Sequence, residues 1–342
     1  MENNELNLDQ LLGDEWDVPQ EEPANEIKKI RGSLRKRSIS TIAISVALAA
    51  LLLAVTVFGV IPFVESLYWN PEDTTYMNKT DLETTLHAYT ELFLPGYHFR
   101  AVTHQKTGFA SWSLDIRLSS PQGGGVYRGT LNQNTLTVSQ QLTEYSRKSY
   151  YFTRWRDLTY APDPEYIAEM TTLLQELPSY IKLEAAITFS EDLSMEALLE
   201  FHDRWCHYPE RAITWAAVRG FEPNGEWTHY CGFDPAFHGG AGYNGLFIDY
   251  PHFNLGTGEH PRQLEQHFKS LLQYTIDRVE EGKGIVHYDD PDIYQNILDY
   301  VNENGVYTYG CIVTASPEAL LELMQDSDVC YIYLSDGWID VN

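Results

Sequence analysis

The sequence predicts an α+β protein with a single N-terminal transmembrane helix, followed by a large region that mixes strands and helices. Residues 38–64 carry no charged side chain, and about 20 apolar residues are enough for a helix to cross the hydrocarbon core of a bilayer. Beyond them, apolar residues alternate with mostly polar ones over 110–118, which is the period of a half-buried strand. From about residue 163 onward, strand-like and helix-like segments alternate.

Charges on the two sides of the apolar run predict its orientation. Lysine and arginine next to a span tend to remain in the cytoplasm, and acidic residues follow the run. A cleaved signal peptide would have a shorter charged region and a small-residue cleavage site, whereas this run ends in bulky residues. We therefore expect a cytoplasmic tail at 1–38, a membrane helix at 39–64 and an extracytoplasmic C-terminal domain, in a single-pass protein of the cell membrane. The topology-determining cations are Lys28, Lys29, Arg31, Arg35, Lys36 and Arg37.

The first 26 residues are acidic and polar, with a few large apolar side chains among them. Such a segment buries too little surface to fold alone, but it offers anchors for docking on a partner protein. The candidate partner-binding residues are Leu6, Leu8, Leu11, Leu12, Trp16 and Val18. The alternative interpretation is a disordered tail whose basic patch only sets the topology.

The outer region is predicted to hold two domains, at 65–162 and 163–342. The first is strand-rich and membrane-proximal. It is expected to contain a helix over 79–94 and strands over 110–118, 126–129 and 135–139. The prolines at 162 and 164 mark the boundary.

The second domain is predicted to be a ferredoxin-like, split βαβ fold with a long insertion. Two strand-helix units in it resemble each other, KLEAAITFSEDLSMEALLEF and TYGCIVTASPEALLEL, and such a repeat is typical of this motif. Ser190 is expected to cap the helix of the first unit. The expected strands are 181–189, 212–218, 306–314 and 329–334, and the expected helices are 193–202, 261–279, 292–302 and 317–324.

Charge and cysteine content narrow the classes of partner. The net charge of −26 argues against nucleic acid as a partner of the outer region, because nucleic acid is a polyanion and an acidic protein surface repels it. All four cysteines, Cys206, Cys231, Cys311 and Cys330, follow the apolar run. Disulfides persist outside the cytoplasm, and buried free thiols are the alternative.

Few residues indicate catalysis or metal binding. His202, Cys206, His229 and Cys231 are weak candidates for zinc, because no CxxC or HExxH pair fixes a ligand spacing. The GAGYNG sequence at 240–245 formally matches GxGxxG but lacks the strand-then-helix context of a dinucleotide site. No nucleophile stands in a recognisable frame. We therefore expect no catalytic residues, no cofactor and no enzyme. The alternatives are a membrane-anchored extracytoplasmic enzyme, with or without zinc, and a module that binds the wall or another envelope protein.

Several segments resemble a known family. EIKKIRGSLRKRSISTIAISVALAALLLAVTVFGV is similar to the N-terminal membrane module of the sigma factor regulator family of Gram-positive bacteria. YIKLEAAITFSEDLSMEALLEF, ITWAAVRGF and NGVYTYGCIVTASPEALLELMQDSDVCYIYL resemble its C-terminal extracytoplasmic module. Residues 220–260 have no recognisable counterpart. The resemblance implies a single-pass anti-sigma factor that holds an extracytoplasmic-function sigma factor through its tail, while the outer domain senses an envelope state. It also leaves room for a second membrane protein or a homodimer.

Overall fold

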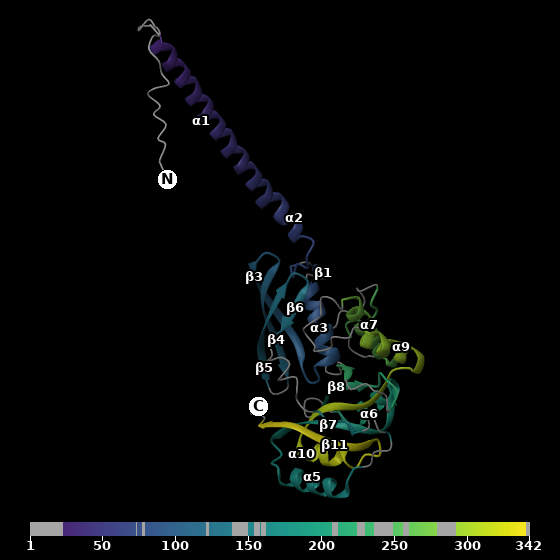
Figure 1. The fold of residues 1–342 in the computed structure, drawn as a ribbon. Helices are drawn as coiled ribbons and strands as arrows, with labels where there is room; N and C mark the ends of the chain where they lie inside the picture. Colours follow the sequence, from purple (N-terminus) through teal and green to yellow (C-terminus); the bar gives the residue numbers. More distant parts are fainter. Residues whose placement is uncertain are drawn as a thin grey trace, which may run out of the picture. The chain divides into compact units, whose positions relative to one another are not determined.

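A computed structural model describes most of the chain and divides it into two compact units, Met1–Leu67 and Tyr68–Asn342 (Figure 1). The described residues are 23–72, 74–76, 79–120, 123–138, 150–153, 158, 162–206, 211–223, 230–235, 249–255, 260–278 and 292–339. The predicted tail anchors, His229 and the 240–245 glycine segment lie outside them.

The described part of the first unit is one long helix with a widened turn. Helix α1 (Pro23–Val55) continues through the π-helical turn η2 (Thr56–Val60) into α2 (Ile61–Glu65). Pro62 has no amide hydrogen to donate to the preceding turn, and this interruption coincides with the wider π turn. Residues Asn25–Glu65 are long and apolar enough to cross a membrane. The predicted apolar helix is present and fits a single-pass membrane anchor, and the six predicted cations lie exposed on α1.

The second unit begins with a small ribbon, a helix and a four-stranded sheet. Strands β1 (Thr74–Tyr76) and β2 (Lys79–Thr80) precede helix α3 (Asp81–Phe93). The sheet then follows the chain order β3-β4-β5-β6, all antiparallel. Its strands are β3 (His98–Gly108), β4 (Ser111–Ser120), β5 (Gly123–Asn132) and β6 (Thr135–Val138). Along β4 the side chains are buried at alternate positions, as the sequence predicts.

A second sheet has the ferredoxin-like arrangement. Its order is β11-β7-β10-β8-β9, and neighbouring strands are antiparallel. Numbered along the chain, the four main strands therefore lie in the order 4-1-3-2, which confirms the predicted split βαβ fold. The elements are β7 (Ile181–Ser194), α6 (Met195–Trp205), β8 (Ala212–Val218), β9 (Cys231–Phe233), β10 (Tyr307–Ala315), α10 (Pro317–Leu323) and β11 (Val329–Ile339). The predicted insertion lies between β8 and β10 and contains β9, α7 (Pro261–Asp277) and α9 (Asp292–Asn304).

Two helix starts differ from expectation. The predicted cap at Ser190 is wrong, because β7 continues through it and its amide donates to the carbonyl of Asp328 at 2.8 Å. Ser194 caps α6 instead, and its side chain accepts from the amide of Ala197. Helix α5 (Pro164–Glu176) was not predicted. It begins where the prolines suggested only a boundary, with Asp163 as its cap.

Both faces of the five-stranded sheet are buried. One face, with Leu183, Ile187 and Phe189 of β7, belongs to a hydrophobic cluster that also includes side chains of α3, β4 and α7. On the other face, the rings of Tyr150 and Phe152 pack on a smaller cluster of residues: Ala186, Trp215, Ala217, Tyr309 and Ile312. Both sheets contribute to the larger cluster, and the division at residue 162 remains a prediction.

Candidate functional site

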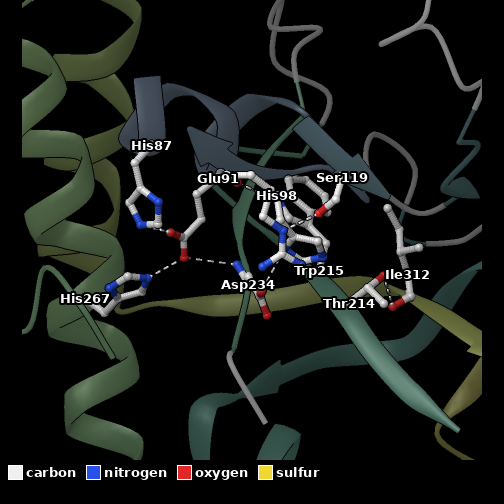
Figure 2. Close-up of polar contacts among 10 residues, drawn as sticks. His87, Glu91, His98, Ser119, Thr214, Trp215, Asp234, His267 and Ile312 are labelled. Carbon is white, nitrogen blue, oxygen red and sulfur yellow. Dashed lines mark hydrogen bonds and ion pairs between the residues drawn. The ribbon is translucent and has the colours of Figure 1, made fainter. Parts of the chain in front are cut away.

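A buried group of titratable side chains lies where helix α3, helix α7 and the end of strand β9 meet (Figure 2). Glu91 of α3 is at its centre, with its side chain 10% exposed. Its Oε1 lies 2.6 Å from Nε2 of His267, and its Oε2 lies 3.1 Å from Nε2 of His87. The backbone amide of Asp234 also donates to Oε1, at 3.3 Å. We call these residues, together with His98, the Glu91 cluster.

Helix α3 places two members of the cluster on one face. His87 and Glu91 are four residues apart, so their side chains lie one turn apart on the same side of the helix. The neighbouring positions Leu82, Leu86 and Tyr89 are buried in the core. The ring of His87 packs near that of Phe253. These contacts fix the direction in which the Glu91 carboxylate points.

Helix α7 brings in His267 from the insertion. His260 is the N-cap of α7, and Pro261 occupies the first turn. The backbone amide of His260 donates to the side chain of Gln263, as in a capping box. His267 is fully buried, and its Nδ1 lies 2.9 Å from the carbonyl oxygen of His252. One turn later, Ser270 donates to the carbonyl of Pro251 at 2.6 Å. The loop at 249–255 is therefore attached to α7 next to the cluster.

Asp234 extends the cluster to the four-stranded sheet. Its Oδ2 lies 3.1 Å from Nδ1 of His98, the first residue of β3. In addition, the indole of Trp215 on β8 donates to the backbone carbonyl of Glu91 at 2.8 Å (Figure 2). Glu91 thus contacts both the insertion and the ferredoxin-like sheet.

A second group of polar contacts joins α3 to α7 at the other end of the helix pair, away from the Glu91 cluster. Asp81 begins α3, and its carboxylate accepts from Arg278 at 3.2 Å and from the Tyr274 hydroxyl at 3.0 Å. Since Asp81 pairs with the end of α7 and Glu91 with its first half, the two helices run antiparallel. Asp81 lies at the positive end of its helix dipole and Arg278 at the negative end of the other, so both charges are favourably placed.

The cluster holds separated charges in a dry environment. Burial by itself raises the pKa of Glu91, but the charge of His267 and the hydrogen bonds from His267 and His87 lower it well below its ordinary value. Burial lowers the pKa of His267, and the charge and hydrogen bond of Glu91 raise it more, so the result is a raised pKa. The pKa of His98 is raised in the same way by Asp234. The cluster therefore pairs the ionised carboxylate of Glu91 with His267, whose pKa is raised.

This arrangement is typical of contacts that hold two elements of a fold together rather than of a catalytic site. The atoms of Glu91 and His267 that would meet a substrate already contact other protein groups. Within the described parts of the chain, no three His, Cys, Asp or Glu side chains are arranged to hold a metal ion. Removing one partner of a buried ion pair costs about 3–5 kcal/mol because the other charge is left unpaired, so loss of either Glu91 or His267 would disturb the contact between α3 and α7.

The weak zinc candidates have other surroundings. His202 lies 3.3 Å from the carboxylate of Asp203. Burial raises the pKa of Cys206 to about 12 and that of Cys231 to about 12. The Cys231 thiol faces the carbonyl of Val218 at 3.6 Å. The structure joins none of the four cysteines in a disulfide.

Sequence analysis did not identify the Glu91 cluster. Glu91 and His267 are 176 positions apart, and no local pattern reports such a contact. The spacing of His87 and Glu91 was the available signal, but the same spacing is common on solvated helix faces.

Comparison with known proteins gives one match. A family model described as sigma factor regulator C-terminal matches residues 174–335. No curated protein and no solved structure matches the chain. The matched range begins in α5 and extends into β11, so it includes Asp234 and His267 of the Glu91 cluster but not His87 or Glu91. The cluster thus joins the matched region to the part of the chain that precedes it. Residues 174–335 thus match the sigma factor regulator C-terminal family, and this match supports a role in sigma factor regulation.

Proposed function

We propose that this protein is a membrane-anchored anti-sigma factor that sequesters an extracytoplasmic-function sigma factor through its N-terminal tail. The observation that carries the proposal is the chain order: an acidic tail, one helix able to cross a membrane, and a domain of a sigma factor regulator family. A sigma factor acts in the cytoplasm, so the part that holds it has to lie on that side. The tail is the segment that positive-inside topology places there.

The chemistry of the tail fits a protein partner. Large apolar side chains such as Leu11, Leu12 and Trp16 would supply the few buried anchors that dominate the free energy of most interfaces. The acidic residues between them, including Asp9 and Asp14, would complement a basic surface and increase the association rate. The tail has no His or Cys, so this binding would need no metal ion.

The outer unit would be the sensor. We propose that it lies outside the cytoplasmic membrane and responds to a wall component or another envelope signal. A single helix transmits such a response by shifting, by pairing with a second membrane protein or by forming a homodimer. The matched family is regulatory, which favours sensing over catalysis. The polar atoms of the buried Glu91 cluster contact other protein groups, and this also favours sensing.

Co-purification of the full-length chain from host membranes tests the proposal. We expect one extracytoplasmic-function sigma factor to accompany the wild-type chain and to be lost from a variant with Leu11, Leu12 and Trp16 changed to Ala. A promoter reporter for that sigma factor should rise in the same variant. Leu173→Ala, at an exposed position of α5, is the control and should retain the sigma factor. If the wild-type chain brings down no sigma factor, the proposal fails.

The orientation can be tested separately. Cysteine is introduced at Asn3 in the tail or at the exposed Tyr180 of the outer unit, and intact cells are treated with a membrane-impermeant maleimide. The unsubstituted chain provides the background from the native cysteines. We expect labelling above background at position 180 and none at position 3 until the cells are opened. The reverse pattern would place the tail outside and exclude sigma factor binding there.

A further inference from the structure

His267 has a hydrogen-bonding environment that requires both ring nitrogens to carry a proton. Its side chain is 2% exposed, so water cannot replace a lost partner. Nδ1 lies 2.9 Å from the carbonyl oxygen of His252, and a carbonyl oxygen only accepts. Nε2 lies 2.6 Å from Oε1 of Glu91, and an ionised carboxylate also only accepts. With an acceptor at each nitrogen, the ring is an imidazolium.

The surroundings keep Glu91 ionised. Its Oε1 already accepts the backbone amide of Asp234, and its Oε2 faces Nε2 of His87. The low pKa of the carboxyl agrees with this geometry. The carboxylate therefore cannot relieve the contact by supplying a proton of its own near neutral pH.

Loss of the His267 proton would turn one of its two contacts into a pair of facing acceptors. It would also leave a buried carboxylate whose contact on α3 is with the half-buried His87. Unsatisfied groups of this kind are costly in a dry interior. The contact most affected is the one that joins α3 to α7.

The contact at the other end of the helix pair does not depend on a histidine proton. Arg278 remains protonated at any physiological pH, so its contact with Asp81 persists. The helix pair therefore has one end that depends on a histidine proton and one end that does not. We propose that the Glu91–His267 contact is a pH-sensitive latch, which holds α3 against α7 while His267 keeps its second proton and opens when the surroundings become alkaline.

The direction of the effect follows from the groups around the latch. Those facing it are His87 on α3, Asp234 after β9, and His98 with Arg100 on β3. The pKa of His267 is raised, so its stabilisation is complete below the ordinary value of about 6.5 and is lost as pH rises through the raised pKa. The pKa of Glu91 is lowered, so acid weakens the latch only well below its ordinary value. His98 titrates in the same direction as His267, and variants are needed to separate the two.

Hydrogen exchange of the full-length chain in lipid nanodiscs tests the latch between pH 6 and 9, with rates corrected for the intrinsic effect of pH. We expect amides of α3 near Glu91, of α7 near His267 and of the 249–255 loop to lose protection as pH rises. The loss should be about tenfold for each unit by which the His267 pKa exceeds its unfolded value. Constant protection over this range would overturn the proposal. This readout does not involve a sigma factor, so its failure is distinct from failure of the proposed function.

Three variants assign the effect. His267→Gln should remove most of the pH-dependent change. In Glu91→Gln the charge that contributes most to raising the pKa of His267 is gone while burial still lowers it, so opening should move to lower pH. His202→Gln, which removes a histidine on α6, should keep the wild-type profile. A His267→Gln chain that keeps the full wild-type profile would refute the latch.

A measurement on the wild-type chain covers the case in which these variants misfold. The chain is labelled with ¹⁵N in its histidine rings, and the resonances are followed with pH. One buried histidine should stay doubly protonated through pH 7. If every histidine is neutral at pH 7, the imidazolium and the latch are both excluded.

Discussion

Replacing Gly232 by alanine should separate β9 from β8 and disturb the Glu91 cluster. A Cβ at this position would lie 2.0 Å from the carbonyl oxygen of Ala216 and 2.5 Å from the ring of Trp215. The first of these atoms belongs to the backbone of β8, which pairs with β10 on its other side. Because β8 is held on that side, β9 has to move.

The expected cost comes from packing. β9 is joined to β8 at three residue pairs, Ala216↔Phe233, Ala217↔Gly232 and Val218↔Cys231. Phe233 is fully buried and packs against Phe268. Overpacking costs about 1–3 kcal/mol, and removing a buried phenylalanine from its pocket costs about 3–5 kcal/mol. Since Asp234 follows directly, we expect a loss of about 3–5 kcal/mol in the free energy of unfolding.

Thermal unfolding of the detergent-solubilised chain, followed by near-UV circular dichroism, measures this loss. A decrease of about 5–9 °C in Tm is expected for a unit of this size. Gly108→Ala is the matched control, because its Cβ would meet only Ser111 Cβ at 3.8 Å, an ordinary contact. If Gly232→Ala unfolds within about 1 kcal/mol of wild type, which is the lower end for overpacking alone, the close approach of β9 to β8 is not as described.

Three other changes have defined outcomes. Arg278→Gln removes the cation from Asp81, which is mostly buried, and should cost about 1–3 kcal/mol in thermal unfolding; a neutral result would show that the pair contributes nothing. Ser194→Ala and Ser316→Ala each remove a helix cap and should cost about 1 kcal/mol apiece, additively; strong non-additivity would contradict independent caps. Leu51→Arg places a charge within the apolar run at an insertion cost of about 3 kcal/mol and should lower the membrane-bound fraction, whereas unchanged fractionation would refute a membrane helix there.

The sequence predicted the elements whose signals are local. The apolar run at 38–64 and the alternation of 110–118 each depend on neighbouring residues, and both are confirmed. The order of the ferredoxin-like sheet followed from the internal repeat, because a split βαβ motif allows few arrangements. Helix α5 was missed although Asp163 and Pro164 form a cap and a first-turn proline, a combination that marks a helix start.

Tertiary contacts explain what local patterns could not. Ser190 precedes the acidic Glu191 and Asp192 and so resembles a helix start. However, the Asp192 carboxylate accepts from Arg219 at 2.9 Å, and β7 continues beside β10. The Glu91 cluster depends on contacts between a helix before the first sheet and a helix inside the insertion. Neither segment by itself contains information about the other.

The central claim, that the tail holds a sigma factor, is tested most directly with a peptide of residues 1–38. The peptide is immobilised and offered each of the host's sigma factors in turn. The account predicts specific capture of one extracytoplasmic-function sigma factor, with loss of capture when Leu11, Leu12 and Trp16 are changed to Ala. Capture of none of them would contradict the account and would move the function to the outer domain.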